Sequence, residues 1–189
     1  MKPAVALIRS RLPTRQENLP VFAVFVFFGF SWALYRLFWY VPSWLEYLNV
    51  AKILTILAYV MAFALIESLL LTAGVVIFSL FFPPRLFKEK FALLGSSLAA
   101  LLGIAAVLLQ RKINLVYRQE LWQLIAYPLA FLVLLAVAVL LLGLLFRRFP
   151  SLARFTLAVL DRLTIFTYFY VPLSLIGLVV VILRNLIGT

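Results

Sequence analysis

The chain has 189 residues, of which 67% are hydrophobic and 12% are charged. A soluble globular domain carries about 25% charged residues, so this composition excludes that class. The net charge of +11 does not indicate a nucleic-acid binder, because the basic residues are dispersed at the ends of apolar blocks. With no Cys and no His, disulfides and the usual zinc, copper and haem sites are excluded, and we expect no metal, no cofactor and no nucleic-acid partner.

Each apolar block is long enough to supply the roughly 20 residues that a helix needs to cross a bilayer. The sequence therefore predicts an all-α, polytopic membrane protein that forms a single bundle of five transmembrane helices, with no separate soluble domain. The predicted spans are residues 20–40, 53–82, 91–109, 121–146 and 163–183.

The first span is expected to begin at Pro20, since a first helical turn does not need the N–H that proline lacks, and Asn18 can cap it. Basic residues precede the span, as in a signal peptide. Arg36 inside the apolar run and the lack of a small-residue cleavage pattern indicate an uncleaved span instead. Aromatic residues crowd its far end, as in an interfacial belt: Trp32, Trp39, Tyr40, Trp44 and Tyr47.

The second span contains one charged residue, Glu67, near its middle. An ionised carboxylate at the bilayer centre costs about 2.5–3.5 kcal/mol, so we expect Glu67 to be protonated and turned towards other helices. Ser68 and Thr72 lie beside it on the helical wheel. Two interpretations stay open: Glu67 couples protons or cations in a polar path, or it is a neutral hydrogen-bond donor between helices.

The third span carries Gly95, Ala99 and Gly103 at intervals of four residues. Small residues in this pattern let helix backbones approach closely in lipid, and they predict a packing face within one molecule or between two copies. The fourth span is almost entirely Leu, Val and Ala beyond Pro128, and is expected to be the most lipid-exposed. Basic residues between the two spans are either headgroup contacts or ordinary solvated charges: Arg111, Lys112 and Arg118.

The fifth span contains Pro172, which has no N–H to donate to the Tyr168 carbonyl and therefore predicts a kink. We expect Glu67 to donate to that carbonyl or to Ser174, which places the second and fifth spans side by side. Residues 151–162 have apolar side chains at helical spacing. They form either a short cytoplasmic amphipathic helix or an extension of the fifth span.

An odd number of spans places the termini on opposite sides of the membrane. Most of the 17 basic residues fall on the N-terminal side, so the positive-inside rule predicts a cytoplasmic N-terminus and an external C-terminus. We expect the protein to reside in a plasma membrane, as in the bacterial inner membrane.

The leading functional hypothesis is a membrane protein that acts through helix–helix contacts, as a subunit of a complex or by self-association, without catalysis. The alternative is a small transporter or channel component with Glu67 in the path of an unidentified solute or ion. A lipid-modifying enzyme ranks lowest, because the six acidic residues are spread along the chain and form no acid–base pair in the sequence.

Overall fold

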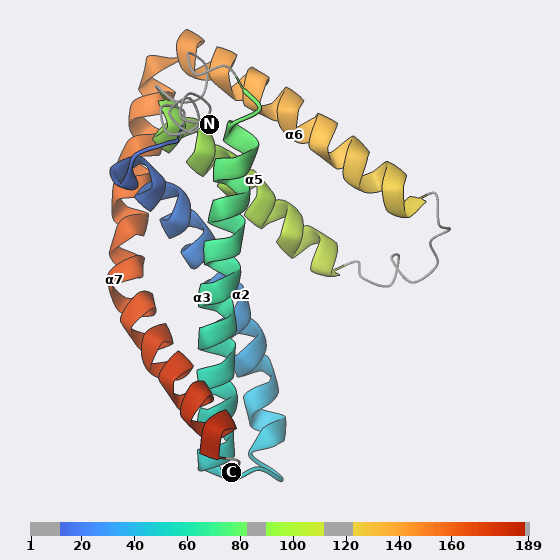
Figure 1. The fold of residues 1–189 in the computed structure, drawn as a ribbon, viewed down its shortest axis with the longest axis vertical. Helices are drawn as coiled ribbons and strands as arrows, with labels where there is room; N and C mark the ends of the chain where they lie inside the picture. The colour runs from blue at the N-terminus through green and yellow to red at the C-terminus, as the bar shows by residue number, and fades with distance from the viewer. Residues whose placement is uncertain (1–11, 83–89, 112–122, 188–189) are drawn as a thin grey trace, which may run out of the picture.

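The computed structural model describes residues 12–82, 90–111 and 123–187, with only the backbone for Arg111, residues 123–126 and Pro128. The described residues form five helices (Figure 1): α2 (Arg15–Trp44), α3 (Val50–Ser79), α5 (Phe91–Arg111), α6 (Gln123–Arg148) and α7 (Pro150–Ile187). All five are long and apolar enough to cross a membrane. This confirms the predicted polytopic bundle of five helices.

Helices α2 and α3 begin earlier than predicted because polar caps extend them beyond the apolar blocks. At the start of α2, the Thr14 backbone N–H donates to the Glu17 carboxylate at 2.6 Å, and the Thr14 hydroxyl accepts from the Glu17 N–H at 3.4 Å. This is a capping box, so the cap is Thr14, and Asn18 lies inside the helix. At the start of α3, the Asn49 side chain accepts from the Lys52 N–H at 2.9 Å.

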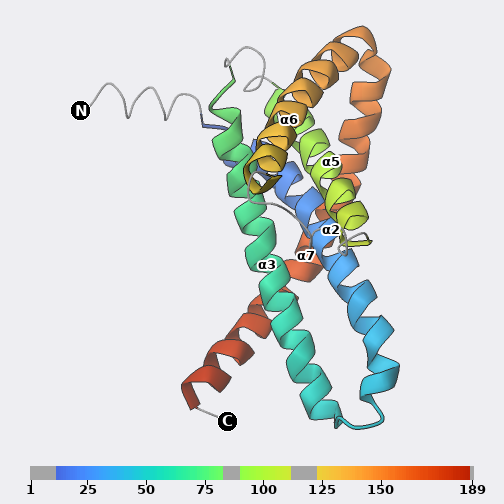
Figure 2. The same ribbon diagram turned by 90° about the vertical axis from the view of Figure 1, so that its right-hand side faces the viewer.

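The bundle has a central part and a lateral part. Helices α2, α3 and α7 pack against one another, and α5 packs chiefly on α2. Figures 1 and 2 show α5 and α6 beside one end of the bundle, while the α2–α3 hairpin extends to the other end. Only 17% of the residues in the most apolar stretch of α6 are buried, and the same fraction holds for α7. The expected lipid exposure of α6 is therefore shared by α7.

Two clusters of apolar side chains hold the helices together. The first joins α5 to α2 and reaches α3, α6 and α7 through Val75, Val139 and Leu160. The second lies between α2 and α3, where Phe30 is fully buried and stacks on Tyr170 of α7 with ring centroids 4.7 Å apart. In lipid such contacts stabilise the bundle through van der Waals packing rather than through removal of apolar surface from water.

The small residues of α5 face α2 within the same molecule. A Cβ added to Gly95 would lie 3.0 Å from Cγ2 of Val21, and one added to Gly103 would lie 2.6 Å from Cγ of Phe28. Ala99, between the two glycines, has no exposed surface. The stripe is therefore the surface on which α2 and α5 approach each other.

Helix α7 is continuous from Pro150 to Ile187, so residues 151–162 are its first turns. Its 38 residues, at about 1.5 Å each, are longer than the roughly 30 Å hydrocarbon layer, so α7 must tilt or extend beyond that layer. Pro172 lies inside the helix, and Figure 1 shows α7 changing direction along its length.

The start of α2 and the end of α7 lie at opposite ends of the bundle (Figure 1). The end at which α2 begins also holds the start of α5, the end of α6 and the start of α7 (Figure 1). These termini carry basic residues: Arg15, Lys90, Arg147, Arg148 and Arg154. That this end faces the cytoplasm stays a prediction of the positive-inside rule.

Candidate functional site

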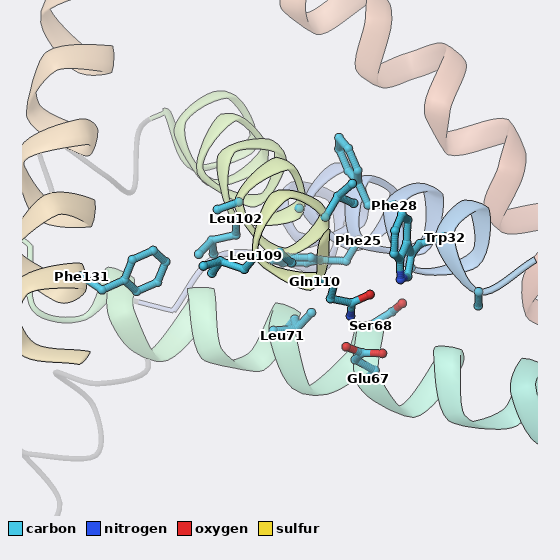
Figure 3. A pocket seen from close by; sticks show the side chains of 16 residues that line it. Phe25, Phe28, Trp32, Glu67, Ser68, Leu71, Leu102, Leu109, Gln110 and Phe131 are labelled. Atoms are coloured by element: carbon cyan, nitrogen blue, oxygen red, sulfur yellow. The ribbon is translucent and has the colours of Figure 1, made fainter. Parts of the chain in front are cut away.

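A cavity of about 300 Å³ lies between α2, α3 and α5, with Phe131 of α6 at its edge (Figure 3). Its walls are formed mainly by apolar and aromatic side chains, among them Phe25, Phe28, Leu71, Leu102 and Leu109. Ligand sites are typically cavities of roughly 300–1,000 Å³ with apolar walls and a few polar groups. This cavity has the size and the composition of a small-ligand site.

Among the described lining residues, four side chains bring polar atoms to the cavity. Glu67 and Ser68 come from the middle of α3, Gln110 comes from the last turn of α5, and Trp32 comes from α2. Figure 3 shows the polar ends of Glu67, Ser68 and Gln110 in the same part of the cavity, with the indole of Trp32 above Ser68. The Ser68 hydroxyl donates to the Ala64 carbonyl at 2.7 Å, so its oxygen can still accept a hydrogen bond.

Glu67 is exposed at the wall of this cavity. Within the described ranges, no hydrogen bond or ion pair joins its carboxylate to another residue. Intramembrane acids otherwise pair with protein groups or line a path, since the hydrocarbon offers no compensation for their charge. The Glu67 carboxylate is therefore placed where a solute or ion that enters the cavity could bind to it.

A second groove, of about 520 Å³, adjoins the cavity and shares Ala33 and Glu67 with it. Arg36 lines this groove, donates to the Tyr40 hydroxyl at 3.3 Å and lies 5.8 Å from the centre of the Tyr40 ring. Gly29 lies opposite Ser68, and Arg36 is seven residues further along α2, which is roughly 10 Å at the helical rise. Arg36 and Glu67 thus face one groove from different depths.

The predicted polar site is only partly brought together. Glu67 and Ser68 share the cavity, whereas Thr72, Tyr168 and Ser174 are not among its described lining residues. The Thr72 hydroxyl donates to the Ser68 carbonyl at 2.7 Å. Tyr168 is 71% exposed on α7, and the buried Ser174 hydroxyl donates to a backbone carbonyl of its own helix, four residues earlier, at 2.6 Å.

The geometry of the α3–α7 contact explains why Glu67 does not face α7. Gly177 approaches Ala58 on α3, and Val171 packs on the cluster that contains Leu65. Glu67 is two residues beyond Leu65, which is about 200° around an α-helix with 3.6 residues per turn. The side chain therefore points to the side of α3 that borders α2 and α5.

The remaining predicted contacts fall outside the structural description. Lys112 and Arg118 lie outside the described residues, and the side chain of Arg111, at the end of α5, is not described. Their interaction with lipid headgroups stays a prediction.

Two lining residues were not expected from the sequence. Trp32 was assigned to the interfacial belt, and Gln110 lies just beyond the predicted end of the third span. Gln110 is seven residues after Gly103, which places the two on one face of the helix. A polar residue on the face of the small-residue stripe was the available signal for this side of the cavity.

The arrangement supports binding more directly than catalysis, because the described lining combines one carboxylate with an amide, a hydroxyl and aromatic rings. Among the described residues, no group of three or more acidic side chains is placed to hold a metal ion. Comparisons with protein-family models, with characterised proteins and with solved structures found no match to this chain, so its function must be inferred from the geometry of the site.

Proposed function

We propose that this integral membrane protein is a small transport component that binds a solute or ion at the cavity beside Glu67. One observation carries the proposal: a carboxylate in the middle of a membrane helix opens onto a cavity and has no partner in the described part of the chain. A purely structural acid would need such a partner to offset the cost of its position within the membrane.

The depth of Glu67 also supports a role in transport. Counted along α3 from Val50 to Ser79, Glu67 is roughly 26 Å from one end of the helix and roughly 18 Å from the other. A solute held there is far from both membrane surfaces. The groove lined by Arg36 and Tyr40 extends from this point towards the α2–α3 hairpin, and its walls are mainly apolar between these two residues and Glu67.

In this proposal Glu67 releases its proton when a cation, or a solute with a hydrogen-bond donor, binds beside the carboxylate. The Ser68 hydroxyl and the Gln110 amide add hydrogen-bonding capacity beside it, and most of the other lining residues are apolar. An uncompensated charge is costly at this depth, so binding and neutralisation of the carboxylate would occur together.

Proton entry into proteoliposomes tests this function. A pH-sensitive dye inside the vesicles reports proton entry under an imposed potential, with and without a panel of small organic cations outside. We expect entry above that of protein-free vesicles, and loss of the excess in Glu67→Gln. Glu46→Gln is the matched control, because Glu46 is exposed in the turn after α2. Unchanged flux in both Glu67→Gln and Glu67→Leu would contradict the proposal.

A second candidate function is supported by the lateral helices. Only 17% of the most apolar stretch of α6 is buried, and the α5–α6 pair stands to one side of the central helices (Figure 1). Such a surface fits a subunit that contacts other membrane helices or a second copy. The small-residue stripe of α5 does not supply that contact, because it packs on α2.

Single-cysteine cross-linking in native membranes tests the subunit role, since the chain has no cysteine of its own. Leu134 on α6 is 63% exposed, whereas Val139 on the same helix is fully buried. A contacting subunit predicts cross-linked products for Leu134→Cys and none for Val139→Cys. Products from neither position, together with a monomer by native mass spectrometry, would exclude this role.

A further inference from the structure

We propose that the cavity beside Glu67 takes a monovalent organic cation with an apolar body, such as a hydrophobic amine or quaternary ammonium ion. The inference rests on the proposed function in that it assigns a ligand class to the same cavity. It follows from the acidic residue in the cavity, the aromatic side chains of its walls, the separation of its polar and apolar sides, and its opening towards the lipid.

The charge of the cavity selects a cation. Glu67 is the one acidic or basic side chain among the described residues that line it. The basic residue of the adjoining groove, Arg36, already donates to the Tyr40 hydroxyl and lies over the Tyr40 ring. An anion in the cavity would meet the carboxylate without a basic group beside it, whereas a cation would neutralise the carboxylate in a medium of low dielectric.

The number of oxygen ligands favours an organic cation over a metal ion. Ca²⁺ takes about 6–8 oxygen ligands, and Mg²⁺ requires a near-ideal octahedral set. From the described lining, the cavity offers one carboxylate, the Ser68 hydroxyl and the Gln110 amide oxygen. An alkylammonium ion carries its own apolar groups, so it does not need a complete shell of oxygen atoms.

The aromatic walls match such a cation. Trp32, Phe25 and Phe28 of α2 line the cavity on the side facing α3 and α5. Tryptophan is the strongest partner in cation–π contacts, which operate within about 6 Å of the ring centre. An ammonium group beside Glu67 could therefore meet both a negative charge and aromatic faces.

The cavity is polar at one side and apolar at the other. Figure 3 places the polar ends of Glu67, Ser68 and Gln110 together, with the side chains of Leu102 and Phe131 away from them. A ligand that fills this space has a charged end and an apolar end. Glu67 and the neighbouring Leu71 are both exposed, so an amphiphile could enter laterally from the lipid.

Binding of three probes of similar shape and different charge tests the inference. The probes are phenyltrimethylammonium, its neutral isostere tert-butylbenzene and the anion benzenesulfonate. Each is titrated into the full-length protein in lipid nanodiscs, with protein-free nanodiscs subtracted, and heat and tryptophan fluorescence are recorded. We expect the cation to bind at least about tenfold more tightly than the other two, as expected for a desolvated charge pair. Equal binding of the neutral isostere, or preference for the anion, would overturn the assignment.

Variants then locate the site. Glu67→Gln should weaken cation binding by at least about tenfold, and Trp32→Leu should abolish the ligand-induced fluorescence change that arises in the cavity. Glu46→Gln should bind as the unmodified protein does. If Glu67→Gln binds the cation with unchanged affinity, the site is not this cavity. The comparison of the three probes on the unmodified protein stays decisive even if a variant fails to fold.

The outcomes separate this inference from the transport role. Cation binding that requires Glu67, without any proton or cation flux, supports the ligand class and contradicts transport. Flux that requires Glu67, with no binding of the cationic probe and no inhibition by it, supports transport and overturns the ligand class.

Discussion

Gly177 is the position at which one added methyl group should most disturb the contact between α3 and α7. A Cβ there would lie 2.7 Å from the carbonyl oxygen of Ala58 and 3.4 Å from its Cα. These are backbone atoms of a helix, so they cannot rotate aside, and the two helices must separate. Overpacking of this kind costs about 1–3 kcal/mol. The substitution also gains about 0.8–1.0 kcal/mol of helix propensity, which leaves a net loss of about 0–2 kcal/mol for Gly177→Ala.

Gly74→Ala on α3 supplies the matched control, because among the described residues no atom beyond the neighbouring backbone of α3 lies within 4 Å of a Cβ built at Gly74. It reports the propensity gain without the clash. The free energy of unfolding, measured by circular dichroism in mixed micelles of mild detergent and dodecyl sulfate, should therefore differ between the two variants by about 1–3 kcal/mol, with Gly177→Ala the less stable. Equal stability of the two variants would refute the close crossing of α3 and α7 at this glycine.

Three further substitutions probe the site and the helix ends. Glu67→Leu should leave the unfolding free energy unchanged or raise it, because no described residue loses a hydrogen bond; a loss of about 0.6 kcal/mol or more would indicate an interhelical hydrogen bond instead. Thr14→Ala removes the cap shared with Glu17 and should destabilise the start of α2 by about 1 kcal/mol, seen as faster amide exchange in its first turn. Tyr59→Phe removes the 3.3 Å hydrogen bond to Asn185 of α7 and should cost about 0.5–1.5 kcal/mol in the same micelle titration; a value near zero would show that this bond contributes nothing.

The class of the fold could be predicted from the sequence because the thickness and the apolar interior of the bilayer set the length and the composition of each span independently. Five apolar blocks were enough to identify five helices. The helix ends were less accessible, since Thr14 and Asn49 extend helices into polar sequence where hydropathy gives no signal. Local capping chemistry, rather than apolar content, sets these boundaries.

Only the part of the site that lies on α3 could be predicted from the sequence. Glu67 and Ser68 stand out because they are polar within an apolar span. Which neighbours they meet depends on the rotation of α3 about its axis. Almost all the remaining positions of that helix are apolar, so no periodic pattern in the sequence marks its buried face. The contribution of Gln110 depends on where α5 ends relative to α3, which is set by the packing of Gly103 on α2.

The close crossing at Gly177 has a consequence for biogenesis. Its partner, Ala58, leaves the ribosome about 120 residues earlier, which at roughly 5–20 residues per second is a delay of roughly 6–24 s. During that interval α2 and α3 are already synthesised while α7, which packs on both, is not. Their contact surface must be held by lipid or by another helix until α7 arrives. Insertion of α7 is therefore the step that completes the central bundle of α2, α3 and α7, and truncation before α7 should leave the α2–α3 hairpin without its main partner.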